Sequence, residues 1–163
     1  MFDRILLALD DTPASEVALL FAGALARRTG ASVHIVHVNE RIVACNGVTL
    51  RTRDEATALV TGAVRQLAEA GVTASGSACV STYRRIAERI VAKADEVSAD
   101  AIVLGSTRNR HWMRIFSAQV RERTTRMTSL PVLTAPAPLK ISSLPVPGSW
   151  DDPVRRAVDT LFH

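Results

Sequence analysis

Hydrophobic positions along the chain follow two patterns, short apolar runs and longer stretches of helical period. The runs Arg4 to Leu9 and Ala101 to Leu104 are almost continuously apolar, which is typical of central parallel strands covered by helices on both faces. Ser32 to Val38 alternates β-branched residues with histidines and predicts another strand. Weaker patterns predict an edge strand over Val72 to Val80 and a last short strand over Val132 to Ala135.

Amphipathic stretches of helical period separate these strands. The first is framed by recognisable ends, because Thr12 suits an N-cap, Pro13 suits the first helical position and Gly30 follows a cationic last turn. The predicted helices cover Pro13 to Arg28, Thr52 to Ala70, a segment beginning at Ser81 or Thr82, and about Ser117 to Met127. Between the second strand and second helix, Asn39 to Arg51 shows no period and is predicted to be a long connection.

The alternation of strands and helices predicts the fold class. Short apolar strands joined through helices are βαβ units with right-handed crossovers, so we expect an α/β fold, a doubly wound five-stranded parallel sheet with helices on both faces. From Pro136 the sequence is rich in proline and loses its period, until Asp152 and Pro153 introduce a short apolar stripe. We therefore expect one domain over residues 1–136, and over 137–163 an extended linker with a C-terminal amphipathic helix.

Composition limits the class of protein. The chain has 163 residues, 47% of them hydrophobic and 22% charged, which is enough for one sizeable core. No apolar run approaches the roughly 20 residues that cross a bilayer, and Asp3 and Arg4 interrupt any signal-peptide pattern. We expect a cytoplasmic protein without a membrane partner. His34 and His37 fall on opposite faces of their strand and cannot share a metal ion, so no metal site is expected there.

Positive charge is concentrated near the end of the predicted domain. The formal net charge is +4, yet six arginines lie between Arg108 and Arg126 with only Glu122 opposing them. This segment is either a solvated loop and helix face, or a surface for a phosphorylated ligand, an acidic protein partner or nucleic acid. Nucleic acid is the least favoured of these partners, because the segment has no known nucleic-acid-binding motif.

One crevice is predicted to hold whatever ligand chemistry the chain has. In an open parallel sheet, ligands bind at the carboxyl ends of the strands where the winding reverses, here between the first and fourth strands. Asp10 ends the first strand, and the turn of Gly105 and Ser106 ends the fourth and can offer backbone N–H groups to an anion. Asp10 is either a hydrogen-bond acceptor for a ribose hydroxyl or base amino group, or a support for the turn into the first helix.

These residues carry a resemblance to the universal stress protein family. The opening RILLALDDTPASEVAL, the segment DAIVLGS from Asp100 to Ser106, VRER at Val120 to Arg123 and LPVL at Leu130 to Leu133 resemble that family, over about residues 2 to 136. The resemblance implies the family's five-stranded parallel sheet, here with strand order 3-2-1-4-5, and a homodimer formed through the last strand near Val132. It also implies that Asp10 stands at the place of the family's characteristic aspartate.

The family's ATP-binding pattern is altered in this chain. That pattern is glycine, two residues, glycine, nine residues, glycine and then serine or threonine. Gly105 keeps the first position, whereas Arg108, Ala118 and Gln119 occupy the other three. A Cβ where backbone must lie against a phosphate displaces the phosphate or disfavours a positive φ, and Gln119 changes donor geometry. By resemblance, the candidate cofactor-binding residues are Asp10, Gly105, Ser106, Arg108, Gln119 and Val120.

Three functions follow from these observations. The first is a non-catalytic, dimeric regulatory module of the stress response with lost or weakened ATP binding, so that no cofactor is expected although ATP is possible. The second is a nucleotide-binding regulator that holds phosphate with the guanidinium groups of Arg108, Arg110 and Arg114. The third, an enzyme, is disfavoured, because the sequence lacks a P-loop, a nucleophile elbow and a metal-spaced cluster.

Overall fold

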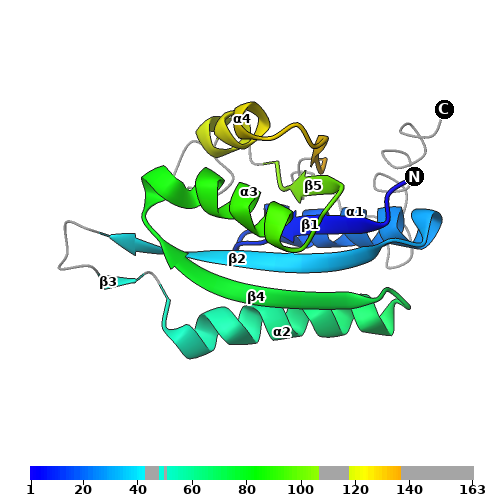
Figure 1. The fold of residues 1–163 in the computed structure, drawn as a ribbon. Coiled ribbons are helices and arrows are strands. Elements are labelled where there is room, and N and C mark those ends of the chain that lie inside the picture. Colours follow the sequence, from blue (N-terminus) through cyan, green and yellow to red (C-terminus); the bar gives the residue numbers. More distant parts are fainter. Residues whose placement is uncertain (43–47, 50, 107–117, 137–163) are drawn as a thin grey trace, which may run out of the picture.

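The computed structural model describes residues 1–42, 48–49, 51–106 and 118–136. Five parallel strands form the sheet in the spatial order β4-β2-β1-β5-β6, which confirms the predicted order 3-2-1-4-5 (Figure 1). A further two-residue strand, β3, pairs with the end of β2 in the antiparallel direction. The strands are β1 (Arg4–Ala8), β2 (Ser32–Ile42), β3 (Val48–Thr49), β4 (Ala74–Ser81), β5 (Ala101–Leu104) and β6 (Val132–Thr134).

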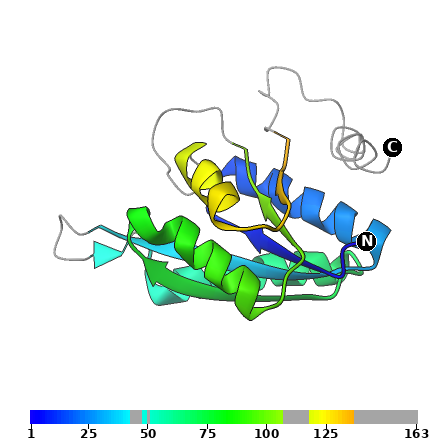
Figure 2. The same cartoon turned by 45° about the horizontal axis from the view of Figure 1, so that its top comes forward.

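The helices cover both faces of the sheet, as a doubly wound fold requires. They are α1 (Pro13–Thr29), α2 (Arg53–Glu69), α3 (Ile86–Glu96), which continues a 3-10 turn η2 (Tyr83–Arg85), and α4 (Ala118–Met127). Figures 1 and 2 show α3 and α4 side by side on one face, whereas α1 and α2 pack on the other. Among the described residues, none of the helices is long and apolar enough to span a bilayer.

Two buried clusters fill the space between the sheet and its helices. Ile5, Leu7 and Ile35 turn toward α1 and α2, whereas Leu6 and Ile102 turn toward α3 and α4. This division follows from the alternation of side chains along a strand. All of these side chains are fully buried, because β1 and β5 are central strands with a helix layer on each face.

The helix ends follow the sequence signals closely. Thr12 is the extended N-cap residue of α1, Pro13 follows it, and Gly30 ends the helix in the left-handed region with φ of 77°. At α2, the Thr52 hydroxyl accepts from the backbone N–H of Glu55, whose carboxylate accepts in return from the N–H of Thr52. This capping box satisfies two N–H groups that the helix itself leaves unpaired.

Two boundaries differ from the sequence-based prediction. Asn39 to Arg51 is not wholly a connection, because β2 continues to Ile42 and β3 returns along it. The buried Asn39 and Glu40 hid this extension, since polar residues break the apolar alternation that predicts a strand. In addition, the third helix begins with the η2 turn, and Ser81 is the last residue of β4. The predicted linker and C-terminal helix over 137–163 lie outside the described residues.

Candidate functional site

Asp10 and the turn after β5 lie at the same edge of the sheet. β1 and β5 pair in parallel with Leu7 beside Val103, and Asp10 and Ser106 each follow three residues later. From this point the chain enters α1 on one face of the sheet and, after β5, leads to α4 on the other. The winding therefore reverses between β1 and β5, where a ligand crevice is expected in this fold class.

One oxygen of the Asp10 carboxylate organises the turn into α1. Oδ1 accepts from the Thr12 backbone N–H at 3.0 Å, from the Thr12 hydroxyl at 2.5 Å and from the Ser15 hydroxyl at 2.7 Å. Ser15 Oγ in turn accepts from the backbone N–H of Asp10 at 2.7 Å. Asp10 thus performs the turn-supporting role that was one of its two predicted alternatives.

The second oxygen of Asp10 is available for a different purpose. Within the described part of the chain, Asp10 Oδ2 and His37 Nε2 are both buried without a hydrogen-bond partner. Burial raises the pKa of Asp10 above its ordinary value, opposed by the hydrogen bonds from Thr12 and Ser15 and by the nearby His37. A group that donates hydrogen bonds would satisfy Oδ2, since a buried acceptor left unpaired is costly.

The second buried atom, His37 Nε2, also needs a group that donates a hydrogen bond to it. Its Nδ1 lies 2.9 Å from the carbonyl oxygen of Leu9, and because a carbonyl only accepts, Nδ1 carries the proton in this contact. In the neutral ring Nε2 is then an acceptor. The carboxyl edge of β1 and β2 therefore presents two buried acceptor atoms, which suit a base amino group or a water molecule better than a phosphate.

The start of α4 is tied to the η2 turn rather than open to a ligand. The Tyr83 hydroxyl donates to Gln119 Oε1 at 3.1 Å, and an Arg123 guanidinium nitrogen donates to the carbonyl oxygen of Arg84 at 3.1 Å. Val120 is 2% exposed and belongs to the core cluster beneath α3 and α4. Of the first residues of α4, Gln119 is thus the one with an exposed polar side chain, and it already has a partner.

A brace joins the starts of α1 and α2. Asn39 donates its amide to the Arg51 carbonyl at 2.7 Å and accepts from the Arg51 N–H at 3.1 Å. The Arg51 guanidinium forms an ion pair with Asp11, which follows Asp10 directly. This brace fixes the chain that enters α2 against the turn that enters α1, so the crevice has a defined wall on this side.

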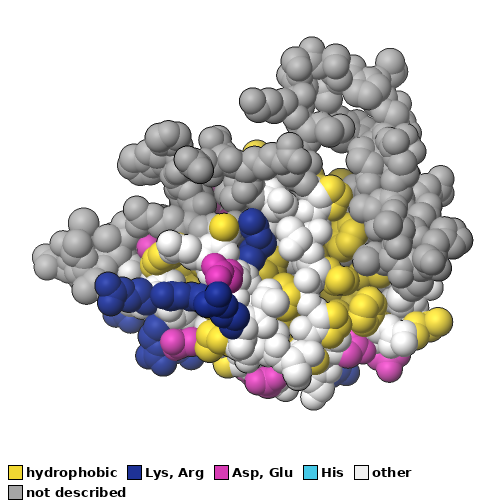
Figure 3. All heavy atoms as spheres, turned by 90° about the horizontal axis from the view of Figure 1, so that it is seen from above, with side chains coloured by type: hydrophobic (Ala, Val, Ile, Leu, Met, Phe, Trp, Pro, Cys, Tyr) yellow, Lys and Arg dark blue, Asp and Glu magenta, His cyan; other side chains and the backbone are white. Residues whose placement is uncertain are grey.

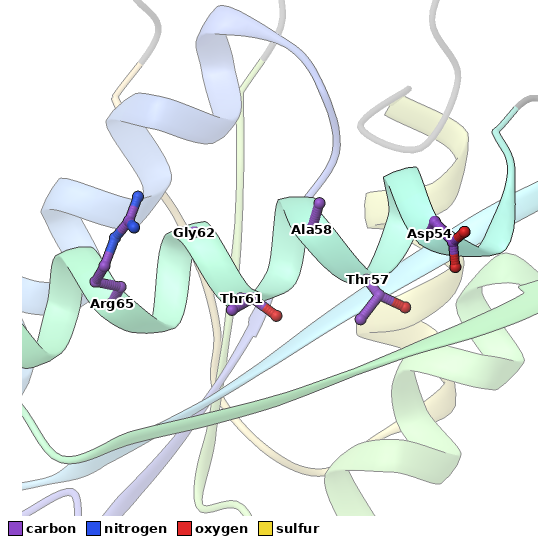
Figure 4. A pocket seen from close by; sticks show the side chains of 6 residues that line it. All are labelled: Asp54, Thr57, Ala58, Thr61, Gly62 and Arg65. Atoms are coloured by element: carbon purple, nitrogen blue, oxygen red, sulfur yellow. The ribbon is translucent and has the colours of Figure 1, made fainter.

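Two hollows lie near this wall. The one that reaches Asp10, with a volume of about 450 Å³, runs between the start of α1 and the middle of α2 and is lined by Leu9, Asp10, Asp11, Thr12, Pro13, Ser15, Glu16, Leu19, Ala58, Leu59, Gly62, Ala63 and Gln66. A neighbouring hollow of about 380 Å³ lies on α2 alone, from Asp54 to Arg65 (Figure 4). Only the first connects with the carboxyl edge of the sheet, so it extends the candidate site.

Basic side chains gather beside the crevice, over α3 and α4. Residues 83–96 and 118–127, which cover η2, α3 and α4, together contain seven basic and four acidic side chains. Seen from above these helices, the dark blue side chains collect on one part of the surface (Figure 3). Arg85 pairs with Glu88 at 2.8 Å and Arg126 with Glu122 at 2.6 Å, which leaves an excess of positive charge on this face.

The family of the chain follows from comparison with known proteins. A model of the Universal stress protein family matches residues 1–136. The chain belongs to the universal stress protein family. This assignment confirms the resemblance found in the sequence and gives the chain the family's broad role in the stress response. No curated protein matches the chain.

Solved structures of universal stress proteins share the fold. A family member from Burkholderia pseudomallei is similar with a TM-score of 0.65 and 25% identity, covering 83% of this chain and 96% of that one. The universal stress protein from Archaeoglobus fulgidus in complex with dAMP has a TM-score of 0.60 and 27% identity, covering 82% and 98%. A universal stress protein in complex with cAMP, at 18% identity and a TM-score of 0.60, covers 84% and 99% and shows the fold alone.

Most of the site residues named from the sequence can now be placed. Asp10, Gly105 and Ser106 lie together at the carboxyl edge of β1 and β5, and Gln119 and Val120 lie in the first turn of α4. Arg108 lies outside the described residues, as do Arg110 and Arg114.

Sequence reasoning missed the partners of these residues. Thr12 is the N-cap residue of α1 as predicted, but its hydroxyl donates to Asp10 and makes no capping bond with the helix. Ser15, five residues after Asp10, could have been recognised as an acceptor for the turn, since serine hydroxyls commonly bond nearby backbone groups. The link between Tyr83 and Gln119 joins residues 36 apart and left no signal in the sequence.

Proposed function

We propose that this universal stress protein is a non-catalytic, cytoplasmic and dimeric regulatory module of the stress response, in which ATP binding is lost or strongly weakened. Its crevice keeps the architecture of the family site, with Asp10, Gly105 and Ser106 at the reversal of the sheet. What differs are the groups expected to hold a triphosphate, at Arg108, Ala118 and Gln119.

One observation carries the loss of ATP binding. Gln119 stands where the family pattern has a hydroxyl, and its side-chain oxygen accepts from Tyr83 at 3.1 Å. This contact fixes the orientation of the amide, and the glutamine side chain is longer than the hydroxyl of the pattern, so its NH2 donor stands farther from the backbone and takes up room that a phosphate would need. Ala118 adds a Cβ where the pattern has glycine, so backbone N–H groups cannot approach a phosphate as closely.

A regulatory role without catalysis agrees with the chemistry of the crevice. Asp10 is the carboxylate that we assign to the crevice, and its Oδ1 already accepts three hydrogen bonds from Thr12 and Ser15. A general base needs a free oxygen within reach of a substrate proton. Asp10 Oδ2 has no partner among the described residues, but its burial suits it to accept a hydrogen bond from a bound group rather than to exchange a proton with solvent, so we assign this carboxylate to structure and recognition.

A second candidate function is a nucleotide-binding regulator that binds phosphate through arginine side chains. Two observations favour it, the buried and unpartnered Asp10 Oδ2 and His37 Nε2, which would accept from a base amino group. The related protein from Archaeoglobus fulgidus was solved with dAMP, which has a nucleobase of that kind and a single phosphate. In this alternative, the base is held and the phosphate contacts are supplied by guanidinium groups.

The decisive experiment restores the family pattern. Purified native protein is denatured and examined for nucleotide by mass spectrometry, and ATP binding is then measured by calorimetric titration at low salt. We expect no stoichiometric nucleotide in the native protein. The triple variant Arg108→Gly, Ala118→Gly, Gln119→Ser should bind ATP at least about tenfold more tightly, a difference of roughly 1.4 kcal/mol.

The opposite results separate the two candidates. Stoichiometric nucleotide or a micromolar dissociation constant in the native protein would refute the first function. If the native protein binds, Asp10→Ala and Arg108→Ala should each weaken binding under the second function, and the absence of any effect would place the ligand elsewhere. Arg84→Ala is the matched control, because Arg84 is an exposed arginine of the η2 turn outside the family pattern.

We propose that the dimer forms through β6. This strand pairs only with β5 within the described chain, and its other edge is open. Val132 and Leu133 are half-buried there, so that a second copy could cover them while pairing with the open edge. The basic residues over α3 and α4, including the described part of the Arg108 to Arg126 segment, remain available in such a dimer for an acidic protein partner or another anionic ligand.

A further inference from the structure

The other edge of the sheet, β4, is unusual in having no protection against an added strand. β4 pairs with β2 without a bulge from Val33 beside Ala74 to Glu40 beside Ser81, and no strand of the described chain lies on its outer side (Figure 1). Proteins commonly protect such edges with lysine, proline, bulges or very short strands. β4 has eight residues, ASGSACVS, without charge or proline, whereas β6 at the opposite edge has three.

The pairing register identifies the backbone groups that point outward. Val33 donates its N–H to the carbonyl oxygen of Thr73 at 2.9 Å, so Thr73 and every second residue after it face β2. In a parallel ladder, the residues between them turn both N–H and C=O away from the neighbouring strand. These outward residues are Ala74, Gly76, Ala78 and Val80. Gly76, Ala78 and Val80 are exposed, so their donors and acceptors are accessible to another chain.

The two faces beside this edge differ in character. A Cβ on Gly76 would lie 2.5 Å from Val60 of α2, so the side chains of the outward residues turn toward α2. Ser75 and Ser77 turn the other way and hydrogen-bond to His34 at 2.9 and 3.2 Å. Small side chains on both faces keep the backbone of β4 accessible along its length.

Positive charge lies over the α3 side of the edge. Burial raises the pKa of the Cys79 thiol, the positive charges of Arg89 and Lys93 on α3 oppose that rise and the Glu96 carboxylate adds to it, so two cations and one anion of α3 lie near β4. Lys93 is paired with Glu96 at 2.7 Å. Arg89 is exposed and forms no ion pair with any described residue. An added strand would therefore gain from acidic side chains on its α3 face.

We propose that the β4 edge is a docking site for an extended segment of a partner protein that carries acidic side chains on the face turned toward α3. The segment adds a strand to the sheet and bonds to the outward N–H and C=O groups of β4. A second copy of this chain fits less well. Two β4 strands related by a twofold axis perpendicular to the sheet would place the α3 helices of both copies on the same face, so the added strand would bring a second Arg89 and no acidic side chain, since ASGSACVS carries no charge. The inference is independent of the nucleotide site.

A designed peptide tests the proposal without changing the protein. The probe is a fluorescein-labelled octapeptide of alternating valine and glutamate, and its binding to the full chain is followed by fluorescence anisotropy at low salt. Two further probes carry N-methyl groups on alternate residues, one on each edge of the peptide. We expect the unmethylated probe to bind and one methylated probe to lose at least tenfold in affinity while the other keeps it, because only one edge of the peptide faces β4.

Variants of the chain test the residues. Ala78→Pro removes one outward N–H and should reduce binding at least about fivefold; a proline is tolerated on an edge strand where its N–H faced solvent. Ala78→Val, which keeps that N–H, is the matched control. Arg89→Glu should weaken the valine–glutamate probe and strengthen a valine–lysine probe. In amide exchange, the N–H groups of Gly76, Ala78 and Val80 should become protected when the probe is bound.

Three results with the peptide probes would overturn the proposal. These are no binding of the valine–glutamate probe up to about 1 mM, a dissociation constant equivalent to only about −4 kcal/mol; equal binding of the acidic and basic probes; and equal losses for both methylated probes. Self-association of the free protein that Ala78→Pro abolishes would also overturn it, because the occupant would then be a second copy. Should Ala78→Pro unfold the chain, the methylated probes still decide the question.

Discussion

The hydroxyl of Ser15 should be one of the most important single polar groups for stability, and Ser15→Ala tests this. The residue is 3% exposed, and its Oγ accepts from the Asp10 N–H and donates to Asp10 Oδ1, both at 2.7 Å. The substitution leaves a buried N–H without an acceptor and removes a hydrogen bond to a carboxylate. These effects together should cost roughly 2–4 kcal/mol of unfolding free energy.

Urea denaturation followed by circular dichroism measures this loss. With a urea dependence of about 1–3 kcal/mol per molar, the midpoint should fall by roughly 1–2 M while the slope stays the same. Thr61→Ala is the control, because Thr61 is exposed on α2 and its hydroxyl has no hydrogen-bond partner among the described residues, so its effect should remain within about 0.5 kcal/mol. A Ser15→Ala loss no larger than that of the control would show that the Asp10 turn does not depend on this hydroxyl.

Three further outcomes are expected. Burial raises the pKa of Asp10 in the fold above its ordinary value of 3.8, so the contribution of Asp10 to stability is fully present below pH 3.8 and is lost as the pH rises through the folded pKa. The unfolding free energy of the native protein relative to Asp10→Asn, measured in urea over these pH values, should therefore fall with rising pH. A rise would contradict a raised pKa for Asp10. Gly76→Ala should cost about 1–3 kcal/mol in thermal unfolding, because its Cβ would meet Val60 at 2.5 Å, whereas Gly62→Ala meets open space on a helix and should gain about 0.5–1 kcal/mol. Val132→Asp should shift the proposed dimer toward monomer in sedimentation, and an unchanged assembly would place the interface elsewhere.

Most of the fold could be predicted because local signals agreed with the tertiary structure. The Thr12, Pro13 and Gly30 signals delimited α1 to within one residue, and the apolar run at Ala101 identified β5. The extension of β2 could not be predicted in the same way. Asn39 is 4% exposed and satisfied by the backbone of Arg51, a residue twelve positions later. Such compensation is a property of the folded chain and leaves no periodic pattern.

The candidate site was predicted in part for a related reason. The order of the strands was sufficient to bring Asp10 and Ser106 to one edge. The different roles of the two oxygens of Asp10 could not be predicted from the sequence. They depend on the rotamers of Thr12 and Ser15 and on the position of His37 on another strand. Hydrogen-bond geometry of this kind is fixed by packing rather than by the spacing of residues.

The central place of β1 has a consequence for the order in which this protein can fold during its synthesis. Its partner on one side, β2, leaves the ribosome soon after it, and with α1, α2 and β4 it can assemble most of the core beneath α1 and α2. On the other side, β1 waits for β5, nearly one hundred residues later. Until then the nascent chain carries an open apolar edge at Arg4–Ala8. When β5 arrives, the Asp100 carboxylate closes the gap by accepting from the N–H groups of Asp3 and Arg4, so the first and the late parts of the chain are joined at the end of the sheet opposite the crevice.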